Sequence, residues 1–469
     1  MEYTSPTWAV DKEYLTKMFL SKKNVDATRG SLIPLIFAYT IPLIISTLVQ
    51  SLFNAVDLAV LGNMADTAAV ASVGATTAIV HLIVHTFVGL SSGTKIILAR
   101  LIGMKDSPSI KKTVNTSLLS AVWIGVIVAA FGLVFAPDFL RLTNCPSECF
   151  DGALVYIRIY LLGAPAILLY NYGSAVLTSA GDTQRPLYYI IAGGLLNVVL
   201  NIILCLILPE KVMAVAIATI AAQVLGAALV LHRLRVMDGD CKLVIREMRF
   251  NWGAFGKIIR YGAPIAFAQM LYPLSNLQIQ SAINSFGVAA TAGSSAAGTI
   301  EAIPSAFGGS FASTTSVFMG QNIGAGKPDR VKRSFWLCSA IGIGLSLVIG
   351  VAIYFTGEFW LSLLVDEDAI AFGMIRMFYL MLFYFIAVAK ACVSHAIQVY
   401  GYPLADSITS ISGVLLFRVF WMALIYPHYQ TFDNLMLCFL VSWTITLFVN
   451  SIILAVVSAR YKKGIFKKL

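Results

Sequence analysis

Long apolar segments alternate with short polar segments along most of the chain. Each apolar segment has about 20 residues, the length that an α-helix needs to cross about 30 Å of hydrocarbon. The short alternating segments of a lipid-facing β-barrel are absent. The pattern therefore predicts an all-α polytopic membrane protein. Its twelve predicted spans cover about residues 33–58, 68–95, 115–137, 153–176, 187–208, 212–235, 257–283, 288–318, 333–355, 372–398, 405–427 and 433–458.

One short phrase occurs twice in the chain, 221 residues apart. The first copy is Ile102-Gly103 followed by Ile110-Lys111-Lys112-Thr113, and the second is Ile323-Gly324 followed by Val331-Lys332-Arg333-Ser334. Both copies lie between spans and are six spans apart, so the two halves have the same orientation and are related by an axis along the membrane normal. Two further correspondences support this internal repeat: Pro42 and Asn54 with Pro264 and Asn276, and Ser179-Ala180-Gly181 with Val399-Tyr400-Gly401.

The distribution of charge predicts the orientation in the membrane. Of the 469 residues, 58% are hydrophobic and 12% are charged, whereas a soluble domain has about 25% charged residues. The net charge of +10 comes from Lys and Arg in every second loop, and the other loops are mainly acidic. By the positive-inside rule we expect both termini in the cytoplasm and the protein in the plasma (or inner) membrane of the cell.

The repeat and the loops together predict the domain organisation. Residues 1–31 form a cytoplasmic N-terminal segment, and residues 32–235 form a first lobe with spans 1–6. Residues 236–256 connect the lobes on the cytoplasmic side. Residues 257–458 form a second lobe with spans 7–12, and residues 459–469 form a basic cytoplasmic tail.

Several motifs follow one another in order along the chain. They are Phe53-Asn54-Ala55-Val56-Asp57, Ala71-Ser72-Val73-Gly74-Ala75, Ser179-Ala180-Gly181-Asp182-Thr183, Leu196-Asn197-Val198-Val199-Leu200-Asn201 and Gly320-Gln321-Asn322-Ile323-Gly324-Ala325-Gly326. With these motifs the chain resembles the multidrug and toxic compound extrusion (MATE) family, most closely its DinF-like branch. The resemblance implies two six-helix lobes that form a V-shaped cleft. It also implies a multidrug efflux antiporter that exports organic, often cationic, drugs, xenobiotics or metabolites in exchange for H⁺ or Na⁺ by alternating access.

Asp57 is the only acidic residue well inside the spans of the first half. A carboxylate at such a depth costs about 2.5–3.5 kcal/mol on insertion scales, so it is normally paired, hydrated or protonated. Helical spacing places Gln50, Asn54 and Asp57 on one polar stripe. The residues alone fit either an ion-coupling group or a carboxylate satisfied by amides near the end of a helix. The resemblance implies an essential ion-coupling Asp at this position.

Four polar residues in other spans of the first half are further candidates. Asn197 and Asn201 share one helix face, and Asn171 and Thr219 lie in the fourth and sixth spans. Each alone also fits a hydrogen bond between membrane helices. The resemblance places all four around Asp57. Many relatives have Asp where this chain has Asn201, so the pocket carries one negative charge fewer, which favours a proton carrier over a Na⁺ site.

The second half has charged residues inside its spans. Glu301 lies in the eighth span, Lys390 and His395 lie in the tenth, and Arg418 lies in the eleventh. An ion pair of Glu301 with Lys390 or with Arg418 would neutralise charges that are costly in the membrane. The residues fit either a structural pair or a second coupling or substrate site facing the cleft.

Other chemistry has weaker support in the sequence. His81 and His85 are four residues apart, but no third ligand is evident, so we expect no metal site. Cys145 and Cys149 fit either a disulfide or two free thiols. No phosphate-binding loop is present, so the chain is not itself an ATP-driven pump. We expect no cofactor, with H⁺ or Na⁺ acting only as the coupling ion.

Three other classes of function were weighed against an exporter. A flippase of lipid-linked oligosaccharide or lipid from the same superfamily is the main alternative, but the core of the first lobe lacks the central Lys or Arg expected for binding pyrophosphate. An intramembrane enzyme would require catalytic groups to converge, and the two-lobed repeat disfavours a passive channel. We therefore expect a non-enzymatic transporter that works as a monomer in membrane lipid, with a small organic substrate, a coupling cation and no nucleic acid.

Overall fold

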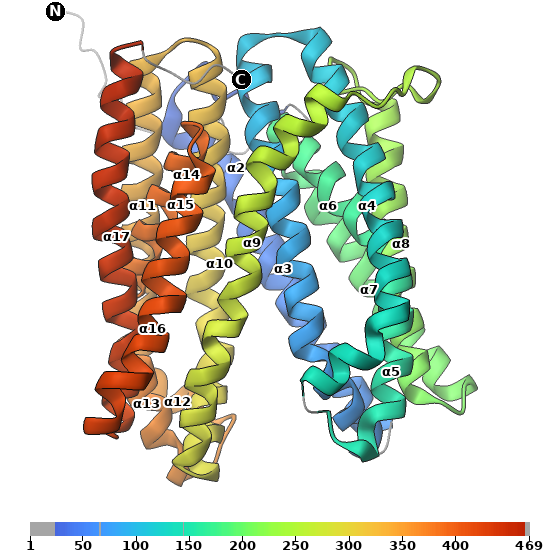
Figure 1. Ribbon diagram of the computed structural model, residues 1–469, viewed down its shortest axis with the longest axis vertical. Coiled ribbons are helices and arrows are strands. Elements are labelled where there is room, and N and C mark those ends of the chain that lie inside the picture. The colour runs from blue at the N-terminus through green and yellow to red at the C-terminus, as the bar shows by residue number, and fades with distance from the viewer. Residues whose placement is uncertain (1–23, 65–66, 144, 465–469) are drawn as a thin grey trace, which may run out of the picture.

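The computed structural model describes residues 24–64, 67–143 and 145–464, which form helices and connecting turns without a β-strand. Figure 1 shows two groups of helices, an N-terminal group coloured blue to green and a C-terminal group coloured yellow to red. The predicted N-terminal segment and basic tail lie partly outside the described residues.

The N-terminal group is the first lobe, and its helices cover six spans. Gly163 separates two of these helices, which meet at an angle of 47° and together form one bent span. The helices are α2 (Leu32–Met64), α3 (Thr67–Met104), α4 (Ser107–Leu142), α5 (Ser147–Leu162), α6 (Ala164–Ser179), α7 (Gln184–Ile207) and α8 (Lys211–Val236).

The C-terminal group is the second lobe, which begins after a connection that contains the short 3-10 helix η1 (Ile245–Glu247). Its tenth span consists of two helices in sequence, and its eleventh contains two π-helical stretches. The elements are α9 (Trp252–Ser285), α10 (Val288–Gly324), α11 (Pro328–Phe355), α12 (Gly357–Ser362), α13 (Glu367–Met381), α14 (Tyr384–Val399), α15 (Pro403–Ser410), η2 (Ile411–Leu416), α16 (Phe417–Phe420), η3 (Trp421–Ile425), η4 (Tyr426–His428) and α17 (Phe432–Lys462).

The observed helices agree with the predicted fold class. Within the described residues, nine helices are long and apolar enough to cross a membrane, or ten when the bent pair counts as one span. The helices α9 and α10 have 34 and 37 residues, which is also sufficient to span. These two helices complete the twelve spans and have more polar residues. The prediction of an all-α, two-lobed polytopic protein is confirmed.

Several helices extend beyond the predicted spans. The first basic segment was expected to form a loop, but Arg100 lies in α3, and Lys111 and Lys112 lie in α4. The carboxylate of Asp106 caps α4 by accepting a hydrogen bond from the N–H of Ser109. Hydrogen bonds from the side chain and backbone of Ser109 lower the pKa of Asp106. Helix propensity and capping continue these helices past the point where hydropathy falls.

Glycines in the repeated phrase bring the two lobes together at one end of the bundle, which we call the inner end. A Cβ atom at Gly103 in α3 would overlap the backbone carbonyl of Gln321 in α10. In the second copy, a Cβ atom at Gly324 would overlap the backbone carbonyl of Arg100. The same glycine in each half therefore permits α3 and α10 to approach closely.

The segment before α2 binds both lobes at the inner end. The N–H of Val25 donates to the carbonyl of Gly181 in the first lobe at 3.1 Å. The N–H of Ala27 donates to Oε1 of Gln321 in the second lobe at 2.9 Å, and Arg330 donates to the carbonyl of Ala27 at 2.8 Å. These hydrogen bonds hold the inner ends of the two lobes against each other.

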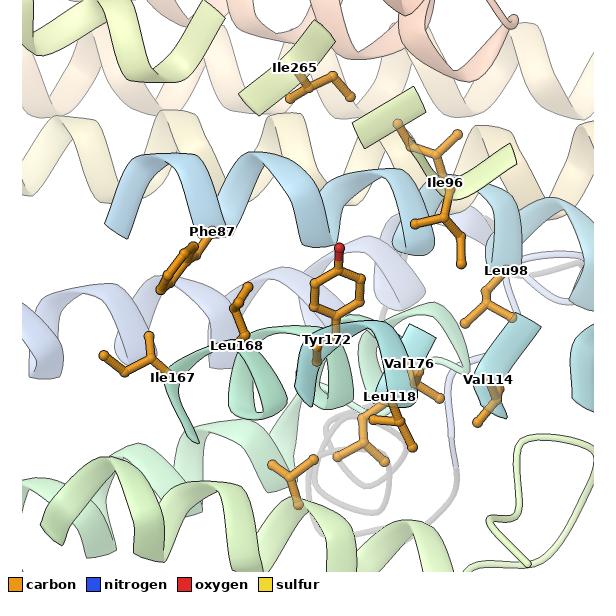
Figure 2. Packing of buried hydrophobic residues seen from close by; sticks show 14 of the residues in the cluster. Phe87, Ile96, Leu98, Val114, Leu118, Ile167, Leu168, Tyr172, Val176 and Ile265 are labelled. Carbon is orange, nitrogen blue, oxygen red and sulfur yellow. The ribbon is translucent and has the colours of Figure 1, made fainter. Parts of the chain in front are cut away.

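A single apolar core continues from the first lobe into α9. Figure 2 shows Phe87 of α3, Leu168 and Tyr172 of α6 and Ile265 of α9 within one cluster of buried side chains. Burying a large apolar side chain contributes about 1.5–3 kcal/mol. Packing along α3 and α9 therefore joins the lobes without a separate linking domain.

Candidate functional site

The polar stripe of α2 lines a small pocket in the first lobe. The pocket has a volume of about 100 Å³, and its walls include Gln50, Asn54 and Asp57 of α2, with Asn197 of α7 and Thr219 of α8. The structure therefore brings together five of the candidate residues of the first half. The volume suits an ion or a few water molecules and is below the roughly 300–1,000 Å³ of small-molecule pockets.

A chain of hydrogen bonds surrounds the carboxylate of Asp57. Nδ2 of Asn201 donates to Oδ1 of Asp57 at 2.7 Å and to Oδ1 of Asn197 at 3.3 Å. Nδ2 of Asn197 lies 3.5 Å from Oγ1 of Thr219, and with its amide turned over it donates to both carboxylate oxygens of Asp57. Asp57 is thus held by amide donors, with no basic side chain within 4 Å among the described residues.

One acceptor beside Asp57 is unused. Among the described residues, Oδ1 of Asn201 is buried and has no hydrogen-bond partner. A carboxylate only accepts hydrogen bonds, whereas a protonated carboxyl group also donates one. The Asn201 side chain therefore provides a donor for the charged form of Asp57, and only with its amide turned over would its oxygen face the protonated form.

Close packing of α2 against α7 positions the pocket. A Cβ atom at Gly194 in α7 would overlap the ring of Phe53 in α2, so a small residue is needed there. Asn197 and Asn201 follow on α7, one turn apart, and both are buried. Tyr156 of α5 also lies near Asp57 and Thr219, a contact that the sequence analysis missed because aromatic residues in spans are common.

Asn171 differs from the other residues expected around Asp57. Its Nδ2 donates to the carbonyl of Ile167 within α6 at 2.8 Å, and Asn171 is not among the residues that line the pocket. The preceding residue, Tyr170, lines the pocket instead. The amide of Asn171 therefore points toward its own helix in this structure, and its role beside Asp57 remains a prediction.

The expected ion partner of Glu301 is also wrong. Nη2 of Arg376 in α13 lies 2.9 Å from Oε2 of Glu301 in α10, and Nη1 of Arg376 donates to Ser294 at 2.8 Å. Glu301 therefore pairs with Arg376 and not with Lys390 or Arg418. Arg376 lies nine residues after the start of α13, in the outer part of the span, and it was not among the cations predicted to pair with Glu301.

Arg418 lies in a buried polar cluster of the second lobe. It is 0% exposed, and its guanidinium group donates to Asn276 at 2.8 Å, to Ser442 at 3.2 Å and to Ser275 at 3.4 Å. Its Nη2 has no hydrogen-bond partner among the described residues. The guanidinium Cζ atom also lies 4.3 Å from the centroid of the Phe439 ring.

A second, larger cavity lies against the second lobe and has a volume of about 400 Å³. Its walls include Lys390, His395 and Asp406, together with His85 from α3 of the first lobe. The ring Nδ1 of His395 is 2.7 Å from Oγ of Ser316. Residues from both lobes thus contribute to this cavity.

The larger cavity adjoins the Asp57 pocket through intervening space between the lobes. A third cavity of about 180 Å³ shares Gln50 with the Asp57 pocket and shares Gly309 of α10 with the larger cavity. A Cβ atom at Gly309 would meet nothing within 4 Å. The three cavities therefore neighbour one another along the faces that the two lobes turn toward each other.

Three polar residues were missed as functional candidates, and two of them, Lys95 and Asp406, lie at the ends of predicted spans. Asp406 accepts hydrogen bonds from Gln398 at 2.8 Å and from Asn450 at 3.1 Å. Lys95 of α3 donates to Ser313 of α10 at 2.9 Å across the lobe interface. Lys95 and Asp406 could have been found because a charged residue within a predicted span is uncommon. Asn450 lies inside the twelfth predicted span.

The histidine and cysteine candidates remain separate. The rings of His81 and His85 lie 6.2 Å apart. No group of three or more His, Cys, Asp or Glu side chains that could hold a metal ion occurs in the described part of the chain. Cys145 and Cys149 are free thiols in the structure.

Comparisons with known proteins identify the class. Residues 42–203 and 264–423 each match the MatE family, so one family pattern occurs once in each half. The probable multidrug resistance protein YoeA of Bacillus subtilis is 26% identical over 410 residues, covering 85% of this chain and 87% of that protein. DNA damage-inducible protein F of Escherichia coli is 22% identical over 241 residues, covering 50% of this chain and 51% of that protein.

The fold comparison agrees with the family match. A solved structure of a MOP superfamily transporter from Pyrococcus furiosus superposes with a TM-score of 0.86, covering 94% of this chain and 99% of that chain at 22% identity. The family match and the long apolar helices together define a multi-pass membrane transporter. The chain belongs to the MatE family, the family of multidrug and toxic compound extrusion transporters.

Proposed function

We propose that this protein is a secondary active exporter that couples efflux of a small organic compound to inward movement of protons through Asp57. The observation that carries the proposal is the Asp57 pocket, where a lone carboxylate faces the amide of Asn201. The amide stabilises the charged carboxylate as a donor, and turning it over would present its unused oxygen to the protonated form, so the group can gain and lose a proton without a change of fold.

A proton is favoured over Na⁺ by the ligands of the pocket. Sodium is a hard cation that prefers several oxygen ligands, and the pocket offers one carboxylate with amide and hydroxyl groups around it. Asn201 supplies no charge where many relatives have Asp. A single carboxylate is sufficient for a proton carrier.

Transport would proceed by alternating access of the two lobes. Parallel repeats provide two similar rigid units that move against each other around a central site. The basic segments at the inner end support an orientation with that end, and both termini, on the cytoplasmic side of the plasma membrane. The lobes meet at the inner end through Gly103 and Gly324, so this arrangement is closed toward the cytoplasm.

The flippase alternative has less support. Two separate matches to the MatE family favour an exporter. The protein would therefore act without a catalytic site, a bound cofactor or ATP, and would use the ion gradient alone.

An imposed proton gradient in Na⁺-free buffer should drive efflux from proteoliposomes. Purified protein would be reconstituted, and the release of one anionic and one cationic fluorescent dye would be followed with and without the gradient. A protonophore should stop the movement, because it removes the driving force and leaves the protein intact. Efflux that strictly requires Na⁺ would contradict the proposed coupling ion, and equal rates with and without any ion gradient would contradict secondary active transport.

A further inference from the structure

The two main cavities differ in size, and the size limits what each can bind. The cavity at the second lobe has a volume of about 400 Å³, against about 100 Å³ for the Asp57 pocket. Pockets for small organic ligands have volumes of roughly 300–1,000 Å³. The larger cavity can therefore hold the organic substrate, while the Asp57 pocket can hold only a small ion or water.

Two cations lie beside the larger cavity around one aromatic ring. Nζ of Lys390 is 5.7 Å from the centroid of the Tyr272 ring, and Cζ of Arg418 is 5.8 Å from the same centroid. Lys390 and Tyr272 line the cavity, and Arg418 is buried behind it. Neither cation has a carboxylate within 4 Å among the described residues. Charges inside a membrane protein are normally paired, so an anion would stabilise this arrangement.

The nearby carboxylates do not neutralise the charges of both Lys390 and Arg418. Glu301 is held in its ion pair with Arg376. The two oxygens of Asp406 accept hydrogen bonds from Gln398 and Asn450, so its charge is already stabilised and can balance no more than one cation. The wall formed by the second lobe therefore keeps an excess of positive charge.

The two halves of the internal repeat hold opposite charges near corresponding positions. Gly181 and Gly401 are 220 residues apart, and the π-helix Ile411–Leu416 then adds one residue to the second half. After this π-helix, Arg418 corresponds to Asn197 of the first lobe. Asn276, which accepts a hydrogen bond from Arg418, corresponds to Asn54. The first lobe thus holds the carboxylate of Asp57 beside Asn197, whereas the second lobe holds the guanidinium group of Arg418 at the position that corresponds to Asn197 itself.

We infer that the cavity of the second lobe binds a small, water-soluble aromatic anion, whose carboxylate or phosphate group lies against Lys390 while its ring packs on Tyr272. An adjoining cavity supplies further aromatic surface from Tyr384 and Trp443, and it also includes Lys390. This inference names the substrate class of the proposed exporter and so rests on that function. It departs from the organic cations that the family resemblance implied.

Equilibrium binding of two matched dyes tests the inference without any ion gradient. Carboxyfluorescein, an anion, and rhodamine 6G, a cation, share a xanthene ring, and their fluorescence anisotropy would be measured with the protein in lipid nanodiscs and with empty nanodiscs. The intact protein should bind carboxyfluorescein at least about 10-fold more tightly. Lys390→Gln should weaken carboxyfluorescein by about 10-fold or more, because a hydrogen bond to a charged group is lost.

Control variants distinguish the loss of the Lys390 charge from a loss of packing. Lys390→Arg keeps the charge and should keep most of the affinity for carboxyfluorescein. Lys112→Gln removes an exposed charge from α4, far from the cavity, and should change neither dye. Asp57→Asn should still bind the anion, because Asp57 lies in the other pocket. If the unsubstituted protein shows this binding pattern but no gradient-driven transport, the proposed coupling is contradicted and the inferred substrate class is not.

Three results would overturn the inference. Tighter binding of rhodamine 6G by the intact protein would assign the cavity to cations. An equal loss of both dyes in Lys390→Gln would give Lys390 a purely structural role. Displacement of carboxyfluorescein by an isoprenyl diphosphate in the nanodisc, but by no soluble aromatic carboxylate, would assign the cavity to a lipid headgroup and reject a water-soluble substrate.

Discussion

Asp57→Asn should abolish the response of efflux to an imposed proton gradient. Asn has nearly the same shape as Asp and cannot release a proton, so Asn201 would face the same neutral group in every state. Coupling between two sites is typically worth about 1–3 kcal/mol, or ~5–150-fold in affinity. Gradient-driven efflux from proteoliposomes should therefore fall by about two orders of magnitude.

Asp138→Asn is the matched control for this substitution. Asp138 is exposed near the outer end of α4 and contacts Arg141 at 3.5 Å, an arrangement that contributes little to stability. The control should keep the full response to the gradient. Both variants should also elute as intact protein and keep the thermal stability of the parent. If Asp57→Asn transports as well as the control, Asp57 has no place in the mechanism.

Gly103→Ala and Gly324→Ala should open the inner end and greatly slow transport. An added methyl group at either position would overlap a backbone carbonyl of the facing helix, which cannot move away as a flexible side chain could. Overpacking of this kind costs about 1–3 kcal/mol. The arrangement closed at the inner end would lose population by about 5–150-fold, and exchange between the two arrangements would slow accordingly.

Gly344→Ala provides the control for the glycine variants. Gly344 is exposed on α11, with nothing within 4 Å of an added Cβ atom. Since Ala favours helix over Gly by about 1 kcal/mol, this change should leave transport intact and preserve or raise stability. Reactivity of a cysteine introduced at Thr178, in the inner half of α6, would report opening. Unchanged reactivity and transport in Gly103→Ala would show that this contact does not hold the inner end closed.

Much of the fold could be predicted from the sequence because a membrane imposes simple rules. Runs of about 20 apolar residues must be helices, since the lipid offers no hydrogen-bond partners for the backbone. The repeated Ile-Gly phrase gave the relation between the halves, and the structure adds the reason for its glycines. The second predicted span ended too early, before Arg100, and the third began too late, after Lys111, because hydropathy falls before the helix ends.

The pocket was partly predictable for a different reason. Residues on one helix have a fixed angular relation, so the stripe of Gln50, Asn54 and Asp57 followed from spacing alone. Contacts between helices depend on how each helix is rotated, which one sequence does not determine. Glu301 was therefore paired with the wrong cation, and the orientation of Asn171 toward its own helix did not follow from the sequence.

The most direct test of coupled alternating access is the distance between the outer ends of the lobes as a function of pH. Spin labels at Leu142, at the end of α4, and at Ser362, at the end of α12, occupy exposed positions on different lobes. Protonation can shift the balance of two arrangements by about 1.4 kcal/mol for each unit by which the pKa of the coupling group differs between them. We predict a distance distribution that changes with pH in the parent protein and changes far less in Asp57→Asn. A distribution independent of pH in transport-active protein would contradict the coupling of lobe movement to Asp57.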